Sequence, residues 1–335
     1  MMSKFCEANE IANYRLSIAP MMDCTDRHFR VLMRQITEKS LLYTEMIVAQ
    51  ALHYSKNRNK LLDFDEIEHP ISIQLGGDDP NLLAEAAHMA ADWGYDEINL
   101  NVGCPSPKVK SGNFGACLMA KPKIVASCIE SMKKSCNIPI TVKHRLGIDN
   151  LDSDDYLIKF VDTCSNAGAE RFIVHARKAW LNGLNPKENR TIPPLQYERV
   201  KRLKNRRPKL IFELNGGLNS INDCIQNLET FDGVMVGRAA YSHPYIWTKI
   251  DSIIYGQKEK FVTRSKIIKN IIPFAQKELA NDGRLWNIGK HIINLIENIP
   301  NAKILRQELS EKCQNKKADV SIFKKIAQQL EDAGH

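Results

Sequence analysis

Residues 97–105 read EINLNVGCP, a run of alternating apolar and polar residues that ends in a Gly-Cys-Pro turn. The alternation predicts a β-strand over Glu97–Val102, and the turn places Cys104 directly after this strand. A free cysteine is most often a small buried hydrophobic residue. A thiol on a tight turn at a strand end is instead placed to act on a ligand, and Asn101 lies three residues before it. We therefore interpret Cys104 as a candidate catalytic residue.

Seven other runs rich in β-forming residues lie on either side of this strand. They are Leu16–Met22, Leu41–Ile47, Ile71–Leu75, Ile140–Arg145, Arg171–Arg177, Lys209–Leu214 and Gly233–Gly237. Helical patterns separate them, and Pro80 and Pro122 each open one, because proline is favoured in the first turn of a helix. Eight strand–helix units in about 240 residues match the size of a (β/α)8 TIM barrel, a fold of the α/β class. A doubly wound open sheet is the alternative, but it usually has fewer strands, and no Gly-x-Gly-x-x-Gly motif follows the first strand here.

The pattern changes after Tyr245, because no β-rich run follows it. Apolar residues instead recur at helical spacing, beginning with residues 267–274, which predicts three or four helices. We therefore expect a TIM-barrel catalytic domain over residues 1–245 and a small all-helical C-terminal domain over residues 246–335. Residues 246–260 are the expected connection.

The composition is that of an ordinary globular protein, with 335 residues of which 43% are hydrophobic and 26% are charged. No stretch approaches the roughly 20 apolar residues of a membrane span, and residues 1–14 lack the apolar centre of a signal peptide. The nine cysteines form no Cys-x-x-Cys pair, which favours reduced thiols over disulfides or structural zinc. We expect a cytoplasmic protein without a membrane segment.

The net charge of +8 is unevenly distributed. Residues 251–335 hold 15 Lys and Arg against 10 Asp and Glu, which favours a polyanionic partner for the helical domain. A solvated basic surface is the alternative that charge alone leaves open. The basic run Arg199–Arg207 precedes the seventh predicted strand, and there we favour a solvated outer helix face over a contact with RNA.

The carboxyl ends of the predicted strands carry the polar candidates, and ligands of TIM barrels bind at this end. In chain order these candidates are Pro20, Met21 and Met22, Gln74, Asn101 and Cys104, Lys143 and Arg145, His175 and Arg177, Asn215, Gly216 and Gly217, and Gly237 and Arg238. Lys143 lies inside the run ITVKH (residues 140–144), which we otherwise expect to be buried, and a lysine there needs a partner. His175 and Gln74 each have an alternative interpretation as hydrogen-bonded core residues.

The glycines after the seventh and eighth predicted strands match the phosphate site that TIM barrels often build there from bare backbone N–H groups. Together with Lys143, Arg238 and a thiol, such a site suggests flavin mononucleotide (FMN). Lys143 is suited to the N1–O2 edge of the ring, which becomes negative on reduction, and Gln74 is suited to orienting the ring. We expect no metal site, because the nine histidines show no His-Glu-x-x-His or comparable spacing.

Several stretches of the chain resemble tRNA-dihydrouridine synthases. They are IAPMMDCTDRH (residues 18–28), LNVGCPS (100–106), FGACLM (114–119), VKHRLG (142–147), HARKAW (175–180), NPKENR (185–190), NGG (215–217) and VGRAAY (236–241). The fifth and sixth of these look like the bacterial A-type subfamily, which reduces uridines 20 and 20a of the tRNA D-loop. The chain departs from the pattern of the family at Cys24, where an aromatic residue is usual.

The resemblance implies reduction of the C5–C6 double bond of uridine to 5,6-dihydrouridine, with FMN as cofactor and NADPH as reductant. It assigns the hydride to FMN N5 and makes Cys104 the proton donor. The implied FMN contacts are Pro20, Met21, Met22, Gln74, Lys143, His175, Asn215, Gly216, Gly217, Gly237 and Arg238. The implied tRNA contacts are Asn101, Lys187, Arg190, Lys303 and Arg306.

The target base is normally stacked inside the folded tRNA, so it must be swung out to reach a barrel mouth, at a cost of a few kcal/mol. We expect tRNA and NADPH as partners of a monomeric protein, and neither a membrane nor a metal. One alternative is an FMN barrel that acts on a free pyrimidine or another small molecule. Another is an RNA-binding barrel without redox chemistry.

Overall fold

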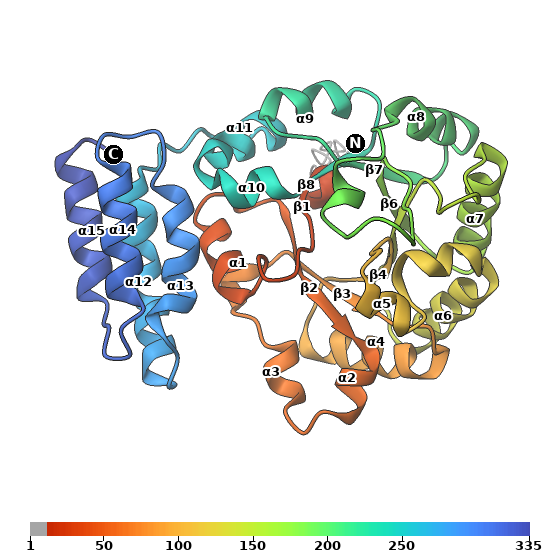
Figure 1. Cartoon of the computed structure of the whole chain (residues 1–335), viewed down its shortest axis with the longest axis horizontal. Coiled ribbons are helices and arrows are strands. Elements are labelled where there is room, and N and C mark those ends of the chain that lie inside the picture. The colour runs from red at the N-terminus through yellow and green to blue at the C-terminus, as the bar shows by residue number, and fades with distance from the viewer. Residues whose placement is uncertain (1–11) are drawn as a thin grey trace, which may run out of the picture.

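The computed structural model describes residues 12–335 and contains a closed barrel of eight parallel strands in chain order (Figure 1). The strands are β1 (Leu16–Ile18), β2 (Leu41–Val48), β3 (Ile71–Gly76), β4 (Glu97–Val102), β5 (Ile140–Arg145), β6 (Arg171–His175), β7 (Ile211–Asn215) and β8 (Gly233–Val236). The predicted TIM barrel is therefore confirmed. The absence of a signal peptide was predicted for a stretch that includes residues 1–11, which lie outside the described residues.

The first strand is shorter than its sequence pattern predicts. It ends at Ile18 rather than Met22, because Pro20 has no backbone N–H to donate and the chain then closes a turn. In that turn, the backbone N–H of Thr25 donates to the carbonyl of Met21 over 3.0 Å. Residues 20–22 consequently lie in a loop at the carboxyl end of β1. The last predicted residues of the sixth and eighth strands, including Arg177 and Gly237, also lie beyond the ends of those strands.

Helices cover the outside of the barrel (Figure 1). They are α1 (Arg27–Arg34), α2 (Ala49–Tyr54), α3 (Arg58–Leu62), α4 (Pro80–Trp93), α5 (Pro107–Ser111), α6 (Pro122–Ser135), α7 (Asp154–Asn166), α8 (Tyr197–Arg206), α9 (Ile221–Leu228), α10 (Arg238–Ser242) and α11 (Ile250–Tyr255). Short 3-10 helices are η1 (Asn13–Arg15), η2 (Glu66–Glu68), η3 (Gly115–Ala120), η4 (Glu188–Arg190) and η5 (Pro244–Lys249). Pro80 and Pro122 begin α4 and α6 as predicted, and the Ser153 side chain caps α7.

The basic run on α8 pairs with acidic residues on and just before the neighbouring helix α7. Arg199 lies 2.6 Å from a carboxylate oxygen of Asp152 and 2.8 Å from one of Asp154, and Arg202 lies 2.9 Å from Asp154. Arg207, directly after α8, continues the pattern with Asp162. These cations therefore hold α8 against α7 on the outer wall of the barrel.

Four helices form a separate bundle beside the barrel, drawn in blue in Figure 1. They are α12 (Arg264–Ala280), α13 (Leu285–Ile292), α14 (Ala302–Cys313) and α15 (Ser321–Asp332), with the short η6 (Ile293–Leu295) after α13. Their apolar faces bury residues such as Ile271, Leu309 and Phe323. The prediction of three or four C-terminal helices is confirmed.

The connection between barrel and bundle contains a helix that packs on the barrel. In α11, the Tyr255 hydroxyl accepts a hydrogen bond from the backbone N–H of Leu16 over 2.9 Å. The division of the chain into domains at residue 245 stays a prediction. None of the helices in the described part of the chain is long and apolar enough to cross a membrane.

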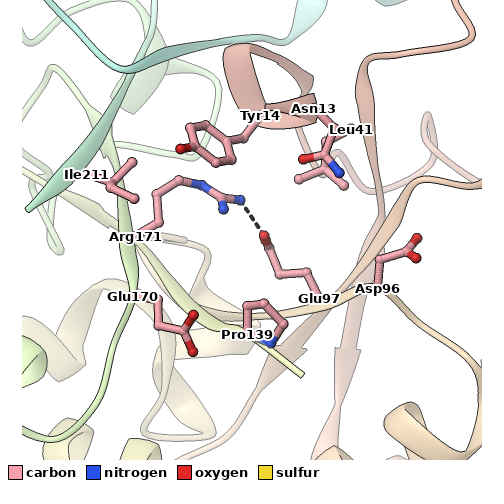
Figure 2. Close-up of a pocket in the computed structure, with 9 residues that line it drawn as sticks. All are labelled: Asn13, Tyr14, Leu41, Asp96, Glu97, Pro139, Glu170, Arg171 and Ile211. Atoms are coloured by element: carbon pink, nitrogen blue, oxygen red, sulfur yellow. Dashed lines mark hydrogen bonds and ion pairs between the residues drawn. The ribbon is translucent and has the colours of Figure 1, made fainter. Parts of the chain in front are cut away.

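The amino end of the barrel holds a buried network of charges around a cavity of about 230 Å³ (Figure 2). Arg171, at the start of β6, forms ion pairs with Glu97 of β4 and Glu213 of β7. The guanidinium of Arg171 also lies 4.4 Å from the centre of the Tyr14 ring. Because its charges pair with one another, we interpret this end as structural, as is usual for TIM barrels.

Candidate active site

Cys104 lies at the carboxyl end of the barrel, on a turn whose backbone is fixed by hydrogen bonds. The Asn101 side-chain oxygen accepts from the backbone N–H groups of Gly103 and Cys104, each over 3.0 Å. The Cys104 carbonyl accepts from the N–H of Ala116 over 2.9 Å. The residue is half-buried, whereas Cys128 is fully buried and its pKa is raised by burial to about 12. Cys104 therefore combines a rigid backbone with an accessible side chain.

A chain of amide side chains runs from this turn into the barrel. The Asn101 amide donates to the Gln74 side-chain oxygen over 2.8 Å, and the Gln74 amide donates to Asn99 over 2.7 Å. Asn99 in turn donates to the Thr141 hydroxyl over 3.0 Å. All four residues are buried, so this chain fixes the orientation of Gln74 and Asn101. The side chain of Asn101 is thus engaged in holding the Cys104 turn, and its contact with tRNA stays a prediction.

Lys143 projects from β5 and finds an amide instead of a carboxylate. Its Nζ donates to the Asn215 side-chain oxygen over 2.9 Å, and the Asn215 amide donates to the carbonyl of Met235 over 2.8 Å. Burial, assisted by the positive charge of Arg145, lowers the pKa of Lys143 to about 7. Among the residues that the structure describes, Lys143 is therefore held in a fixed place without a counter-charge.

The loop after β7 brings bare backbone close to His175. Gly216 and Gly217 have φ angles of 108° and 76°, a region that favours glycine. A Cβ at Gly216 would lie 2.8 Å from a carbon of the His175 ring, and one at Gly217 would lie 2.4 Å from Leu195. Burial, followed by the charge of Arg145, lowers the pKa of His175 well below its usual value, so the ring is neutral at neutral pH. Only glycine avoids these clashes at positions 216 and 217. The turn therefore exposes backbone groups and no side chains.

Positive groups without a carboxylate partner surround this loop. Within residues 12–335, no Asp or Glu oxygen lies within 4.0 Å of the charged groups of Lys143, Arg145, Arg177, Arg190 or Arg238. Burial, and then the charge of Arg238, lower the pKa of both Arg177 and Arg190. Clustered cations whose charges are not neutralised by nearby carboxylates are a candidate site for anions.

Arg145 has a role at this site that its position in the sequence does not reveal. Its Nε donates to the carbonyl of Gly103 over 2.9 Å, and its Nη1 donates to the carbonyl of Asn189 over 3.0 Å. Asn189 is fully buried and precedes Arg190. Arg145 therefore ties the Cys104 turn to the loop of Arg190. Its place at the carboxyl end of β5 made Arg145 a polar candidate, whereas its two carbonyl partners lie 42 and 44 residues away along the chain.

The loop after β1 lines the same end of the barrel. Pro20 and Met21 are half-buried, whereas Met22 is 55% exposed. Cys24, which departs from the pattern of the family, is half-buried, and burial together with Glu45 raises its pKa.

The remaining predicted tRNA contacts lie on two separate parts of the molecule (Figure 1). Lys187 and Arg190 are exposed in the loop after β6. Lys303 and Arg306 are exposed on α14 of the helical bundle. Their contact with tRNA stays a prediction.

A parallel eight-stranded barrel with a thiol, clustered cations and a bare glycine turn at its carboxyl end has the architecture of a barrel enzyme with its chemistry at that end. A family model for dihydrouridine synthase (Dus) matches residues 17–332, and the chain belongs to this family. The predicted resemblance is therefore confirmed.

Curated relatives match over almost the whole chain. A protein of Synechocystis sp. is 54% identical over 296 residues, which cover 88% of each chain. A protein of Escherichia coli O6:H1 is 45% identical over 92% of this chain and 93% of its own. Both are named tRNA-dihydrouridine(20/20a) synthase. Among solved structures, a 2-naphthoyl-CoA reductase complex aligns with a TM-score of 0.53 at 11% identity, over 70% of this chain and 49% of that one, which shows the fold alone.

Proposed function

We propose that this protein reduces the C5–C6 double bond of uridine at positions 20 and 20a of the tRNA D-loop, giving 5,6-dihydrouridine. The observation that carries the proposal is the cluster of unneutralised cations beside a half-buried thiol, in a chain of the dihydrouridine synthase family. The names of the relatives supply the substrate and the positions.

The residues at the carboxyl end fit an FMN cofactor. The glycine turn at residues 216–217 has positive φ angles and carries no side chains, so its bare backbone N–H groups suit a phosphate. Lys143 has no carboxylate partner in the described part of the chain and a pKa of about 7, so an anionic ring edge would restore its charge. We propose that FMN is held by Pro20, Met21, Met22, Gln74, Lys143, His175, Asn215, Gly216, Gly217, Gly237 and Arg238. Bound FMN, supplied with electrons by NADPH, would provide the hydride that adds to C6 of the uracil.

Cys104 completes the reduction by giving a proton to C5. The two backbone hydrogen bonds to the Asn101 side chain fix the turn that carries the thiol at the carboxyl end of the barrel. A positioned proton donor of this kind contributes about 10² to 10⁴ in rate.

Basic residues outside the barrel interior would hold the tRNA. Lys187 and Arg190 at the mouth and Lys303 and Arg306 on α14 are exposed and suited to backbone phosphates. Contacts with phosphates would offset the cost of swinging the base out of its stack. We propose a monomeric cytoplasmic enzyme that uses NADPH.

The proposal is tested with purified protein, FMN, NADPH and an unmodified tRNA transcript that has uridine at positions 20 and 20a. We expect dihydrouridine at one or both positions, as mapped by mass spectrometry of nuclease fragments. Reduction of free uridine or uracil without any reduction of tRNA would contradict it.

A further inference from the structure

The helical bundle docks on the two barrel segments that follow the proposed flavin contacts. One is the start of α1, directly after the β1 loop of residues 20–25. The other is α10, which begins at Arg238. Figure 1 shows α1 and α10 on the side of the barrel that faces the bundle. The interface is therefore continuous with the active site.

Asp26 stands at the centre of the first contact. Its carboxylate caps α1 by accepting from the backbone N–H of Phe29 over 3.0 Å. It also accepts from the bundle, from Nε2 of His291 over 2.9 Å and from Nζ of Lys290 over 2.7 Å. Although burial opposes ionisation, the neighbouring His28, His291 and Lys290 side chains hold the pKa of Asp26 well below its usual value. One carboxylate thus joins α1 to α13.

The β1 loop transmits this contact to the mouth of the barrel. The Thr25 hydroxyl accepts from the N–H of Met21 over 3.0 Å, and the Thr25 carbonyl accepts from Arg30 over 2.8 Å. The loop is therefore closed on itself and anchored to α1 next to Asp26. A change in the position of α13 at Asp26 would act on a rigid segment beside Met21.

The second contact is made by α10 and the residue after it. The carbonyl of Tyr241 accepts from the Asn294 amide over 2.9 Å, and His243 lies 2.6 Å from a Glu297 oxygen. The ring of Tyr241 packs edge-on against His291, with centroids 5.8 Å apart. The two contacts share His291, so the bundle is held at one angle to the barrel.

From this arrangement we propose that Asp26 is a positioning residue that sets the angle of the helical bundle and thereby selects which D-loop uridine reaches Cys104. The inference rests on the proposed function. If the bundle and the mouth bind different parts of one folded tRNA, their relative angle fixes which nucleotide lies over the barrel. Uridines 20 and 20a are neighbours along the tRNA, so a small rotation of the bundle relative to the barrel exchanges the uridine that lies over the barrel.

The test compares Asp26→Asn and Lys290→Met with the wild type on a transcript that has uridine at positions 20 and 20a. The amide introduced by Asp26→Asn can still accept from the N–H of Phe29, but it carries no charge to attract the Lys290 ammonium. Lys290→Met removes the same contact from the bundle side at a partly exposed position, so it guards against a folding defect in the first variant. Asp154→Asn is the matched control, because Asp154 pairs with two arginines on the outer wall of the barrel.

We expect both interface variants to lose about tenfold in kcat/KM for tRNA and to change the ratio of dihydrouridine at 20 and 20a by more than about twofold. The double variant should lose no more than Asp26→Asn alone, since that variant already weakens the Lys290 contact. NADPH oxidation without tRNA and the flavin spectrum should match those of the wild type. Asp154→Asn should leave the tRNA reaction unchanged.

An unchanged position ratio and kcat/KM in both interface variants, with an active wild type, would overturn this inference and leave the proposed function intact. An equal loss of NADPH oxidation and tRNA reduction would also overturn it, because a general structural defect produces that result. A wild type that makes no dihydrouridine in tRNA would instead overturn the proposed function, and this inference with it.

Discussion

The two ends of the barrel differ in how their charged side chains are paired. At the amino end, Arg171 pairs with Glu97 and Glu213, and hydroxyl groups supply further hydrogen bonds to these carboxylates. At the carboxyl end, Lys143 and Arg190 have no acidic partner within the described chain. Buried ions that pair with one another hold strands together, whereas cations left unpaired in a cleft point to an anionic ligand. Stability is therefore assigned to one end of the barrel and function to the other.

The largest expected effect is on the thiol at the carboxyl end. Cys104→Ala removes the proton donor, so dihydrouridine formation should fall by about 10² to 10⁴. FMN binding and flavin reduction by NADPH should persist, because they do not need the thiol. Single-turnover assays with tRNA, alongside the flavin absorbance, measure both. Product formation at the wild-type rate would remove Cys104 from the mechanism.

The next effect is at the amino end. Arg171→Met leaves the buried carboxylates of Glu97 and Glu213 without their cation, which should cost about 3 to 5 kcal/mol in free energy of unfolding. Urea denaturation measures the loss. The folded fraction should still bind FMN and reduce tRNA normally. If the variant were stable but unable to bind FMN, the assignment of this end to structure would be wrong.

Lys143→Met should raise the free energy of unfolding, whereas Arg171→Met lowers it. The pKa of Lys143 in the folded protein, about 7, lies below its ordinary value, so the unfolded chain binds the proton more tightly. The resulting penalty is fully present below pH 7 and disappears as the pH rises towards about 10.5. The cofactor-free variant should therefore be about 1 to 3 kcal/mol more stable than the wild type at pH 7. Urea denaturation at several pH values should show this difference shrinking at alkaline pH.

The effect of FMN on the melting temperature is the control for Lys143→Met. It should raise the melting temperature of the wild type and have little effect on Lys143→Met, because the cation that meets the ring is gone. A variant that is destabilised without the cofactor, or that still gains the full stabilisation from FMN, would contradict the role given to Lys143.

The smallest effects separate unpaired from paired arginines. Arg190→Ala should weaken tRNA binding by about three- to tenfold and lower the slope of log K against log salt by about one. Arg202→Ala removes an arginine that pairs with Asp154 on the outer wall, so it should change neither tRNA binding nor stability by more than about 0.5 kcal/mol. Filter binding at several salt concentrations distinguishes the two. Equal effects would mean that binding depends on overall charge alone.

The strands and the chemistry of the mouth could be predicted from the sequence because both are local. Alternation predicted the ends of β4, and a run of β-forming residues predicted those of β5. The type and place of Cys104 and Lys143 suggested their use. The pattern was wrong at the end of β1, where the turn closed by Thr25 overrides the apolar residues that follow Ile18.

What the sequence did not predict depends on pairs that are distant along the chain. Arg145 reaches Asn189 across 44 residues, and Asp26 reaches His291 across 265. Nor does a sequence show that a cation lacks a partner. The sequence does not distinguish Arg199 from Arg190. In the structure, Arg199 is paired with two aspartates, whereas Arg190 has no acidic partner among residues 12–335.

The unpaired cations and Cys104 at the carboxyl end are proposed to serve one redox reaction on tRNA, and an anaerobic experiment can follow that reaction from start to finish. The FMN-loaded protein is bleached with one equivalent of NADPH and then mixed with unmodified tRNA. We predict that the yellow flavin absorbance returns as dihydrouridine forms in a one-to-one ratio. A flavin that stays bleached in the presence of tRNA, or a purified protein that binds tRNA but retains no FMN, would show that these residues do not serve such a reaction.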